Sequence, residues 1–152
     1  MSKRLTKKWT KTTEQAFGAT GRKGAIGEKF FAEIYTQRGY EVIVTESDRK
    51  MQLKGIDIIL KKDDASYTID IKNNLKKDNS FCVEINSEGW LFNTKYLNEY
   101  VSHVNPETRT IATYKRDTMK DFIDNHFWDF REDVISLHKD DPRLTFIKWQ
   151  FV

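Results

Sequence analysis

The feature that most limits the fold of this chain is a pair of alternating runs, GIDIIL (residues 55–60) and SYTIDIKN (66–73), joined by a polar turn. Alternation of apolar and polar side chains is typical of a β-strand with one buried face, and two such runs joined by a short polar link predict an antiparallel hairpin. The even-numbered apolar residues of the first run share one face, and Asp57 lies on the other. The hairpin should therefore have a core face and a polar face.

A turn centred between Asp63 and Asp64 sets the register of this hairpin. In that register Asp57 lies directly opposite Asp70, and the two β-carbons are roughly 4.5 to 5.5 Å apart, a spacing at which like charges destabilise a sheet. A raised pKa, a basic neighbour or a divalent cation could offset the repulsion. Lys72 lies on the same face as Asp70 and supplies part of the compensation.

A third carboxylate comes from an amphipathic helix predicted from about Ala25 to Arg38. Its apolar residues recur at helical spacing and are Ile26, Phe30, Phe31, Ile34 and Tyr35. Glu28 falls on the border of this stripe, where a carboxylate can turn inward, and Gly39 ends the helix. Carboxylates from two rigid strands and a packed helix form the hard, oxygen-rich site that Mg²⁺ prefers, usually with several waters retained. A magnesium site is the simplest explanation for the paired aspartates.

The rest of the chain also reads as α/β. Further strands are predicted at 41–46, 81–85, 108–115 and 144–152. A second helix is predicted to begin with Asp117 as its N-cap. The expected buried stripe of this helix is Met119, Phe122, Ile123, Phe127 and Phe130. The segment 86–105 shows no clear period and receives no assignment. Its aromatic residues, Trp90, Phe92, Tyr96 and Tyr100, are expected in the core rather than stacked on bases.

At 152 residues the chain is long enough for one compact domain, predicted over 24–152 after a basic arm at 1–23. The cations of the arm are Lys3, Arg4, Lys7, Lys8, Lys11, Arg22 and Lys23. Such an arm commonly binds polyanions because it releases their counterions, although a solvated tail has the same composition. No run reaches the length of a membrane span, and the single cysteine, Cys82, cannot form an internal disulfide. We expect a cytoplasmic protein.

The acidic and basic residues of the helix and the hairpin together resemble the PD-(D/E)XK nuclease superfamily, which includes restriction enzymes, Holliday junction resolvases and some homing endonucleases. The matching residues are Glu28, Asp57, Asp70 and Lys72. The resemblance covers residues 24–73, and GEKFFAEIYTQRGYEVI (27–43) is especially similar to the resolvase-like branch. Ile56 replaces the proline of the motif, and Asp70 replaces the more frequent glutamate; both departures occur in the superfamily. The resemblance implies a restriction-endonuclease-like α/β core, with a central mixed β-sheet flanked by α-helices.

The resemblance also implies roles for individual residues. Asp57 and Asp70 would bind Mg²⁺ directly, together with the backbone carbonyl of Ile71, and Glu28 would hold the metal directly or through water. Lys72 would orient or help deprotonate the attacking water and stabilise charge on the phosphate. Mn²⁺ is expected to substitute for Mg²⁺. The implied reaction is hydrolysis of a DNA phosphodiester that leaves a 5′ phosphate and a 3′ hydroxyl.

The implied substrate is double-stranded or branched DNA, with Lys95 as a further candidate phosphate contact. One site cuts one strand, so a homodimer or higher homo-oligomer is expected. The residues leave open a homing or restriction-type enzyme and a junction-resolving one. They also leave open a catalytically inactive nucleic-acid-binding protein with the same fold and, more weakly, a module whose acidic face binds a basic protein. His103, His126 and His138 lack ligand spacing and are expected to be structural or surface residues.

Overall fold

The computed structural model describes residues 19–128 and 132–152, and within this part the side chains of residues 19–23 are not described. The helices are α2 (Ala19–Gln37), α3 (Arg49–Leu53) and α4 (Arg116–His126). The larger sheet contains β1 (Glu41–Val44), β2 (Ile58–Lys62), β3 (Ala65–Lys72), β5 (Tyr100–Asn105), β6 (Thr110–Lys115) and β8 (Lys148–Phe151). The smaller sheet pairs β4 (Ser80–Glu84) with β7 (Val134–His138). No helix among the described residues has both the length and the apolar character that a membrane crossing requires.

The predicted hairpin is the β2–β3 pair, and its register is as expected. Ile58 pairs with Ile69, and Leu60 pairs with Tyr67. In the larger sheet the strand order is β1-β2-β3-β5-β6-β8, and β3 and β5 run parallel whereas the other neighbours are antiparallel. The prediction of an α/β fold with a central mixed sheet flanked by helices is therefore confirmed.

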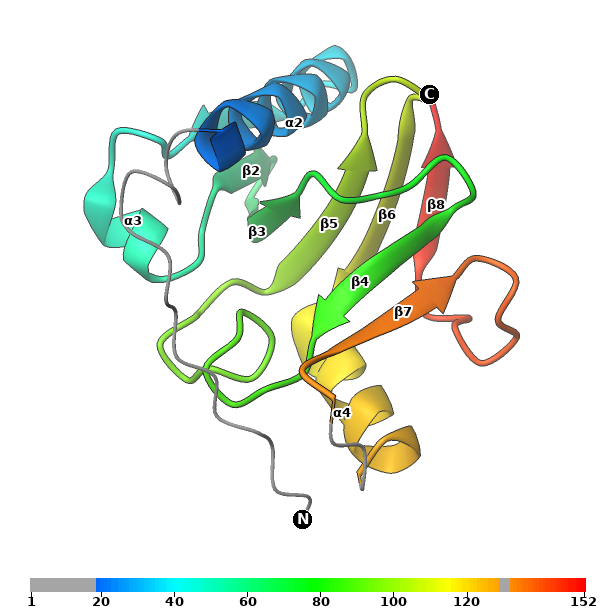
Figure 1. Cartoon of the computed structure of the whole chain (residues 1–152). Helices are drawn as coiled ribbons and strands as arrows, with labels where there is room; N and C mark the ends of the chain where they lie inside the picture. Colours follow the sequence, from blue (N-terminus) through cyan, green and yellow to red (C-terminus); the bar gives the residue numbers. More distant parts are fainter. Residues whose placement is uncertain (1–18, 129–131) are drawn as a thin grey trace.

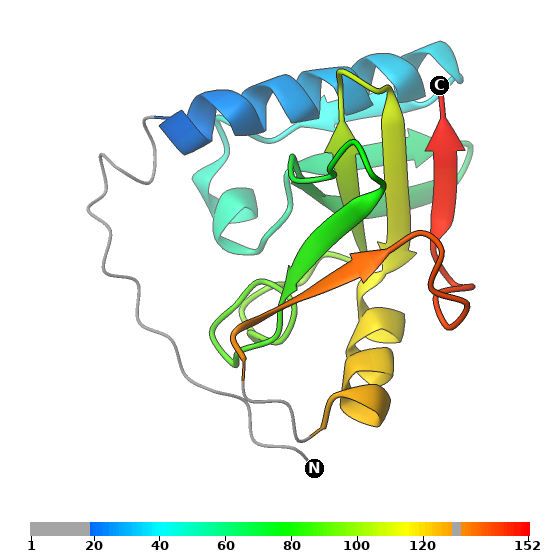
Figure 2. The same cartoon turned by 45° about the vertical axis from the view of Figure 1, so that its right-hand side comes forward.

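Each face of the larger sheet is covered by a different set of elements. Helix α2 lies along one side of the sheet, and β4 and β7 cross in front of β5 and β6 on the other (Figures 1 and 2). Under α2, Phe31 and Ile34 pack on Ile58 and Ile69. The second core lies between the two sheets and extends to the buried side of α4. The pleat of one strand can thus serve two cores, because successive side chains point to opposite faces.

Helix α2 begins six residues before the predicted start at Ala25, and one member of the predicted apolar stripe points outward. Ile26 is 59% exposed. The helix packs instead on the face of Gly27, where an added Cβ would lie 3.0 Å from both Asn73 Cβ and Val104 Cγ2. Because this close approach orients the helix, Ile26, one position away, turns toward solvent.

Helix α4 begins at Arg116, so the prediction that Asp117 is its N-cap is wrong. Lys115 occupies the cap position and makes no side-chain capping bond, whereas Asp117 lies in the first turn. The buried Arg116 guanidinium donates hydrogen bonds to the carbonyls of Tyr96 and Asn93, which ties the helix start to the preceding segment. The predicted stripe is buried at three positions and packed against the core at a fourth, namely Met119, Phe122, Ile123 and Phe127. Phe130 lies outside the described residues.

Candidate active site

Asp57 lies immediately before β2 and is tied to β3 by both its backbone and its side chain. Its backbone N–H donates to the carbonyl of Ile69 at 2.9 Å. Its Oδ2 atom accepts a hydrogen bond from the backbone N–H of Ile71 at 2.8 Å. The Asp57 carbonyl in turn accepts from the N–H of Thr45, which follows β1. Asp57 is therefore held by backbone groups of two neighbouring segments, and its carboxylate is oriented by the N–H of Ile71.

Asp70 projects from β3 beside Asp57 and is only 5% exposed. The two carboxyl groups are hydrogen-bonded to each other. Burial raises the pKa of Asp57 to about 9, and the charge of Asp70 and the hydrogen bond to it add to the effect. Because one carboxylate cannot donate to another, Asp57 is the protonated partner of this hydrogen bond when no cation is present. The paired aspartates expected from the hairpin register are thus brought together.

Lys72 projects from the same strand and lies on the same side as Asp70. Its Nζ atom lies 3.3 Å from Asp70 Oδ2, and its side chain is 27% exposed. Burial acts to lower the pKa of Lys72, but the negative charges of Asp70 and Asp57 outweigh it, so that the net shift is upward. The amine also lies 5.0 Å from the centre of the Trp90 ring. Lys72 is therefore a charged amine held next to the paired aspartates.

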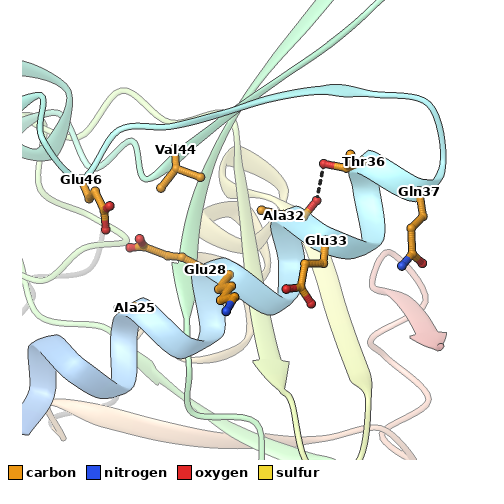
Figure 3. Close-up of a pocket in the computed structure, with 9 residues that line it drawn as sticks. Ala25, Glu28, Ala32, Glu33, Thr36, Gln37, Val44 and Glu46 are labelled. Atoms are coloured by element: carbon orange, nitrogen blue, oxygen red, sulfur yellow. Dashed lines mark hydrogen bonds between the residues drawn. The ribbon is translucent and has the colours of Figure 1, made fainter.

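Glu28 reaches toward this centre from α2. Its pKa is raised to about 7. Burial is the largest cause, and repulsion from Glu46 and then from Asp70 adds to it. Glu28 lines a groove of about 660 Å³ between α2 and the end of β1, and Figure 3 shows its carboxylate facing that of Glu46. Glu46 ends the predicted strand 41–46, but nothing in the sequence marks it as part of a site. The groove gives Glu28 access to solvent, and neither aspartate lines it.

The donor set suits a hard divalent cation bound with retained water. Asp57 and Asp70 carry more negative charge than they can hold together without a proton or a cation, and the adjacent Ile71 can offer a backbone carbonyl. Within residues 19–128 and 132–152, no three His, Cys, Asp or Glu side chains are grouped closely enough to surround a metal ion. The two aspartates are thus the side chains that could bind such an ion directly, and Glu28 would act through water.

Comparison with known proteins shows what this architecture is similar to. No family model matches the sequence, and no curated protein does. A solved structure described as that of a bacterial homing endonuclease, I-Ssp6803I, superposes with a TM-score of 0.54 over 83% of this chain and 80% of that one, at 16% sequence identity. The two proteins share a fold. The similarity of this chain to a nuclease therefore rests on architecture.

The other predicted contacts with nucleic acid are Lys95 and the cations of the basic arm, and most of the arm lies outside the described residues. Lys95 is exposed in the segment between β4 and β5, where its backbone N–H donates to Asn93 Oδ1. Five cations of the predicted arm lie outside the described residues: Lys3, Arg4, Lys7, Lys8 and Lys11. Arg22 and Lys23 fall in the first turns of α2, and their side chains are not described.

A buried polar network lies beside Lys72 and was not anticipated. His103 pairs with Lys72 across the parallel β3–β5 strands. Its Nδ1 atom lies 2.6 Å from Asn74 Oδ1, and its Nε2 atom lies 2.7 Å from the Tyr114 hydroxyl. Burial lowers the pKa of His103 well below its usual value, so the ring is neutral. The sequence signal was a histidine within the short run VSHVN (101–105), but its partners Asn74 and Tyr114 come from other parts of the chain.

Proposed function

We propose that this protein is a Mg²⁺-dependent DNA endonuclease with a site of the PD-(D/E)XK type. The observation that carries the proposal is the hydrogen-bonded Asp57–Asp70 pair with the Lys72 amine 3.3 Å from Asp70. A buried and a half-buried carboxylate beside an amine, in a fold shared with a homing endonuclease, are suited to phosphodiester hydrolysis. Perturbed pKa values at Asp57 and Glu28 support a functional centre rather than a solvated surface.

The proposed roles follow from the position of each group. Asp57, Asp70 and the Ile71 carbonyl would hold the cation, and Glu28 would act on it through water. Magnesium, when bound, polarises a phosphate oxygen and acidifies a nearby water. Lys72 orients the attacking water and stabilises the negative charge that builds on the phosphate. The hydrogen bond from Ile71 N–H keeps Asp57 oriented while it serves as a ligand.

The substrate proposed is double-stranded or branched DNA, cut by a homodimer or higher homo-oligomer because a single site cuts one strand. A homing or restriction-type enzyme cuts linear duplex, whereas a junction-resolving enzyme prefers a four-way junction. Both substrates therefore belong in one experiment. Sedimentation of the same preparation measures the oligomeric state.

The test compares cleavage of supercoiled plasmid, linear duplex and a four-way junction with Mg²⁺, with Mn²⁺ and with EDTA. We expect metal-dependent cleavage by the wild type and its loss in Lys72→Ala. Asp64→Asn is the matched control, because Asp64 is an exposed acid in the turn of the same hairpin. DNA binding without cleavage under any condition would contradict the proposal and favour an inactive DNA-binding protein with the same fold.

A further inference from the structure

Trp90 supplies the aromatic neighbour of Lys72. It lies in the segment between β4 and β5, and its side chain is 9% exposed. The Lys72 amine lies 5.0 Å from the Trp90 ring centre and 3.3 Å from Asp70 Oδ2. An ammonium at this distance from an indole face is within the range of a cation–π interaction, and tryptophan is the best aromatic partner for it.

The turn that carries Trp90 is packed closely against β4. The N–H of Gly89 donates to the carbonyl of Asn86 at 3.2 Å, and the N–H of Asn93 donates to the carbonyl of Gly89 at 3.0 Å. An added Cβ on Gly89 would lie 2.9 Å from Glu84 Oε2. A glycine at position 89 therefore allows the turn to approach the Glu84 carboxylate, which brings the next residue, Trp90, to the amine.

The Trp90 ring packs against the buried network that contains His103. The Trp90 and His103 rings form a T-shaped pair with a centroid distance of 5.8 Å and an interplanar angle of 61°. His103 is itself fixed between Asn74 and Tyr114 and stacked on Phe81 at 4.1 Å. A ring with such neighbours has little freedom to change rotamer. Trp90 is therefore a rigid surface against which a flexible side chain can be placed.

A lysine needs such a surface because its four-carbon chain is flexible and one ion pair fixes the amine poorly. In the proposed reaction Asp70 also serves as a ligand, so its charge is shared and its hold on the amine weakens. The indole face is uncharged and does not bind Mg²⁺. The indole ring therefore keeps the Lys72 amine in place when Asp70 binds the cation.

We propose that Trp90 is a positioning residue for Lys72, holding the ammonium over its ring at the place where the scissile phosphate is attacked. This inference rests on the proposed endonuclease function. Trp90 does not touch the reacting atoms. It acts by limiting the positions of an amine that does.

The test uses Trp90→Leu, which removes the aromatic face, and Trp90→Phe, which keeps a smaller one. Trp149→Leu is the matched control, because Trp149 is a partly buried tryptophan that packs against the same core from β8. We expect kcat for DNA cleavage to fall about tenfold in Trp90→Leu with KM unchanged, and to be largely retained in Trp90→Phe. Trp149→Leu should leave kcat unchanged even if it lowers stability.

A second measurement does not depend on activity. In protein with labelled lysine, the ε-methylene protons of Lys72, assigned by their loss in Lys72→Met, should be shifted upfield by the indole ring. The shift should disappear in Trp90→Leu and persist in Trp149→Leu. Equal kcat in the two leucine variants, or an unshifted Lys72 signal in the wild type, would overturn the inference while leaving the proposed function intact. Absence of cleavage by the wild type would overturn the proposed function and the positioning role together, even if the ring shift were present.

Discussion

The two faces of β3 carry different kinds of side chain: one face is apolar and the other is charged. Ile69 and Ile71 lie in the apolar cluster under α2. Asp70 and Lys72, on the opposite face, lie beside a buried histidine and an indole ring. The first face is held by hydrophobic burial, which is non-directional, whereas the second depends on individual hydrogen bonds and ion pairs. At β3, therefore, the face under α2 contributes to the apolar core, and the opposite face carries the groups suited to chemistry.

The largest expected effect is on the apolar face. Phe31 is fully buried and stacks on Tyr35 with ring centres 4.5 Å apart. Phe31→Ala should lower the free energy of unfolding by about 3–5 kcal/mol, because it removes a large side chain and leaves a cavity. Urea denaturation followed by circular dichroism measures this change. A loss below about 1 kcal/mol would mean that the core under α2 contributes little, and the comparison would fail.

The next largest effect is expected on the charged face of β3 and is measured as DNA cleavage. Asp70→Asn keeps the shape of the side chain but removes its charge, so DNA cleavage should fall by about a hundredfold or more while the fold remains. Initial cleavage rates and a circular dichroism spectrum of the same preparation measure the two quantities. Asp64→Asn, in the turn of the same hairpin, should leave both unchanged. Full activity in Asp70→Asn would show that the Asp70 carboxylate takes no part in cleavage.

A smaller effect concerns pH in the absence of metal. The pKa of Asp57 is raised from 3.8 to about 9 and that of Glu28 from 4.5 to about 7, so the folded state binds more protons than the unfolded state in this range. Stability should therefore be highest near pH 4 and fall toward pH 9, by at most about 1.4 kcal/mol per pH unit from Asp57, with a smaller, solvent-screened contribution from Glu28 below about pH 7.

Thermal unfolding in EDTA across this pH range measures the dependence. Asp57→Asn should reduce the fall in Tm between about pH 7 and pH 9. Added Mg²⁺ should do the same in the wild type, because a bound cation would replace the proton of Asp57. A metal-free Tm that rises steadily from pH 5 to pH 9 would contradict the pKa shifts on which this expectation rests.

The smallest effect is expected one position away from the packed face of α2. Ile26 is exposed, so Ile26→Ser should change the free energy of unfolding by less than about 0.5 kcal/mol. The comparison with Phe31→Ala in one urea series measures how sharply the helix divides into two sides. A large loss at Ile26 would show that the apolar stripe follows the sequence pattern rather than the face that contains Gly27.

The sequence was most informative where the pattern is local. The hairpin and its register followed from alternation and a polar turn, and the structure confirms both. The five-residue helix α3 was not predicted, since its signal is little more than Asp48 accepting from the N–H groups of Lys50 and Met51. Strand β5 was missed because it contains Ser102 and His103, polar residues whose partners are supplied by other strands.

The roles of Glu28, Asp57, Asp70 and Lys72 stay predictions, whereas their placement is now described. Asp57 and Asp70 could be paired from the sequence because a hairpin is a local structure. The groove partner Glu46 and the neighbour Trp90 could not, since each reaches the site through a segment whose path is set by packing. Neither residue has a spacing that distinguishes it from an ordinary surface acid or core aromatic.

By itself the sequence determined the elements whose side chains repeat with a period: the amphipathic helix, the β2–β3 hairpin and the polar face with its two aspartates. Only the tertiary structure decided that this polar face is buried, with β4 and β7 crossing the sheet (Figure 2) and Trp90 lying against the amine of Lys72. The physical reason is that periodicity reports which residues share a face. What covers that face depends on contacts between segments far apart in the chain.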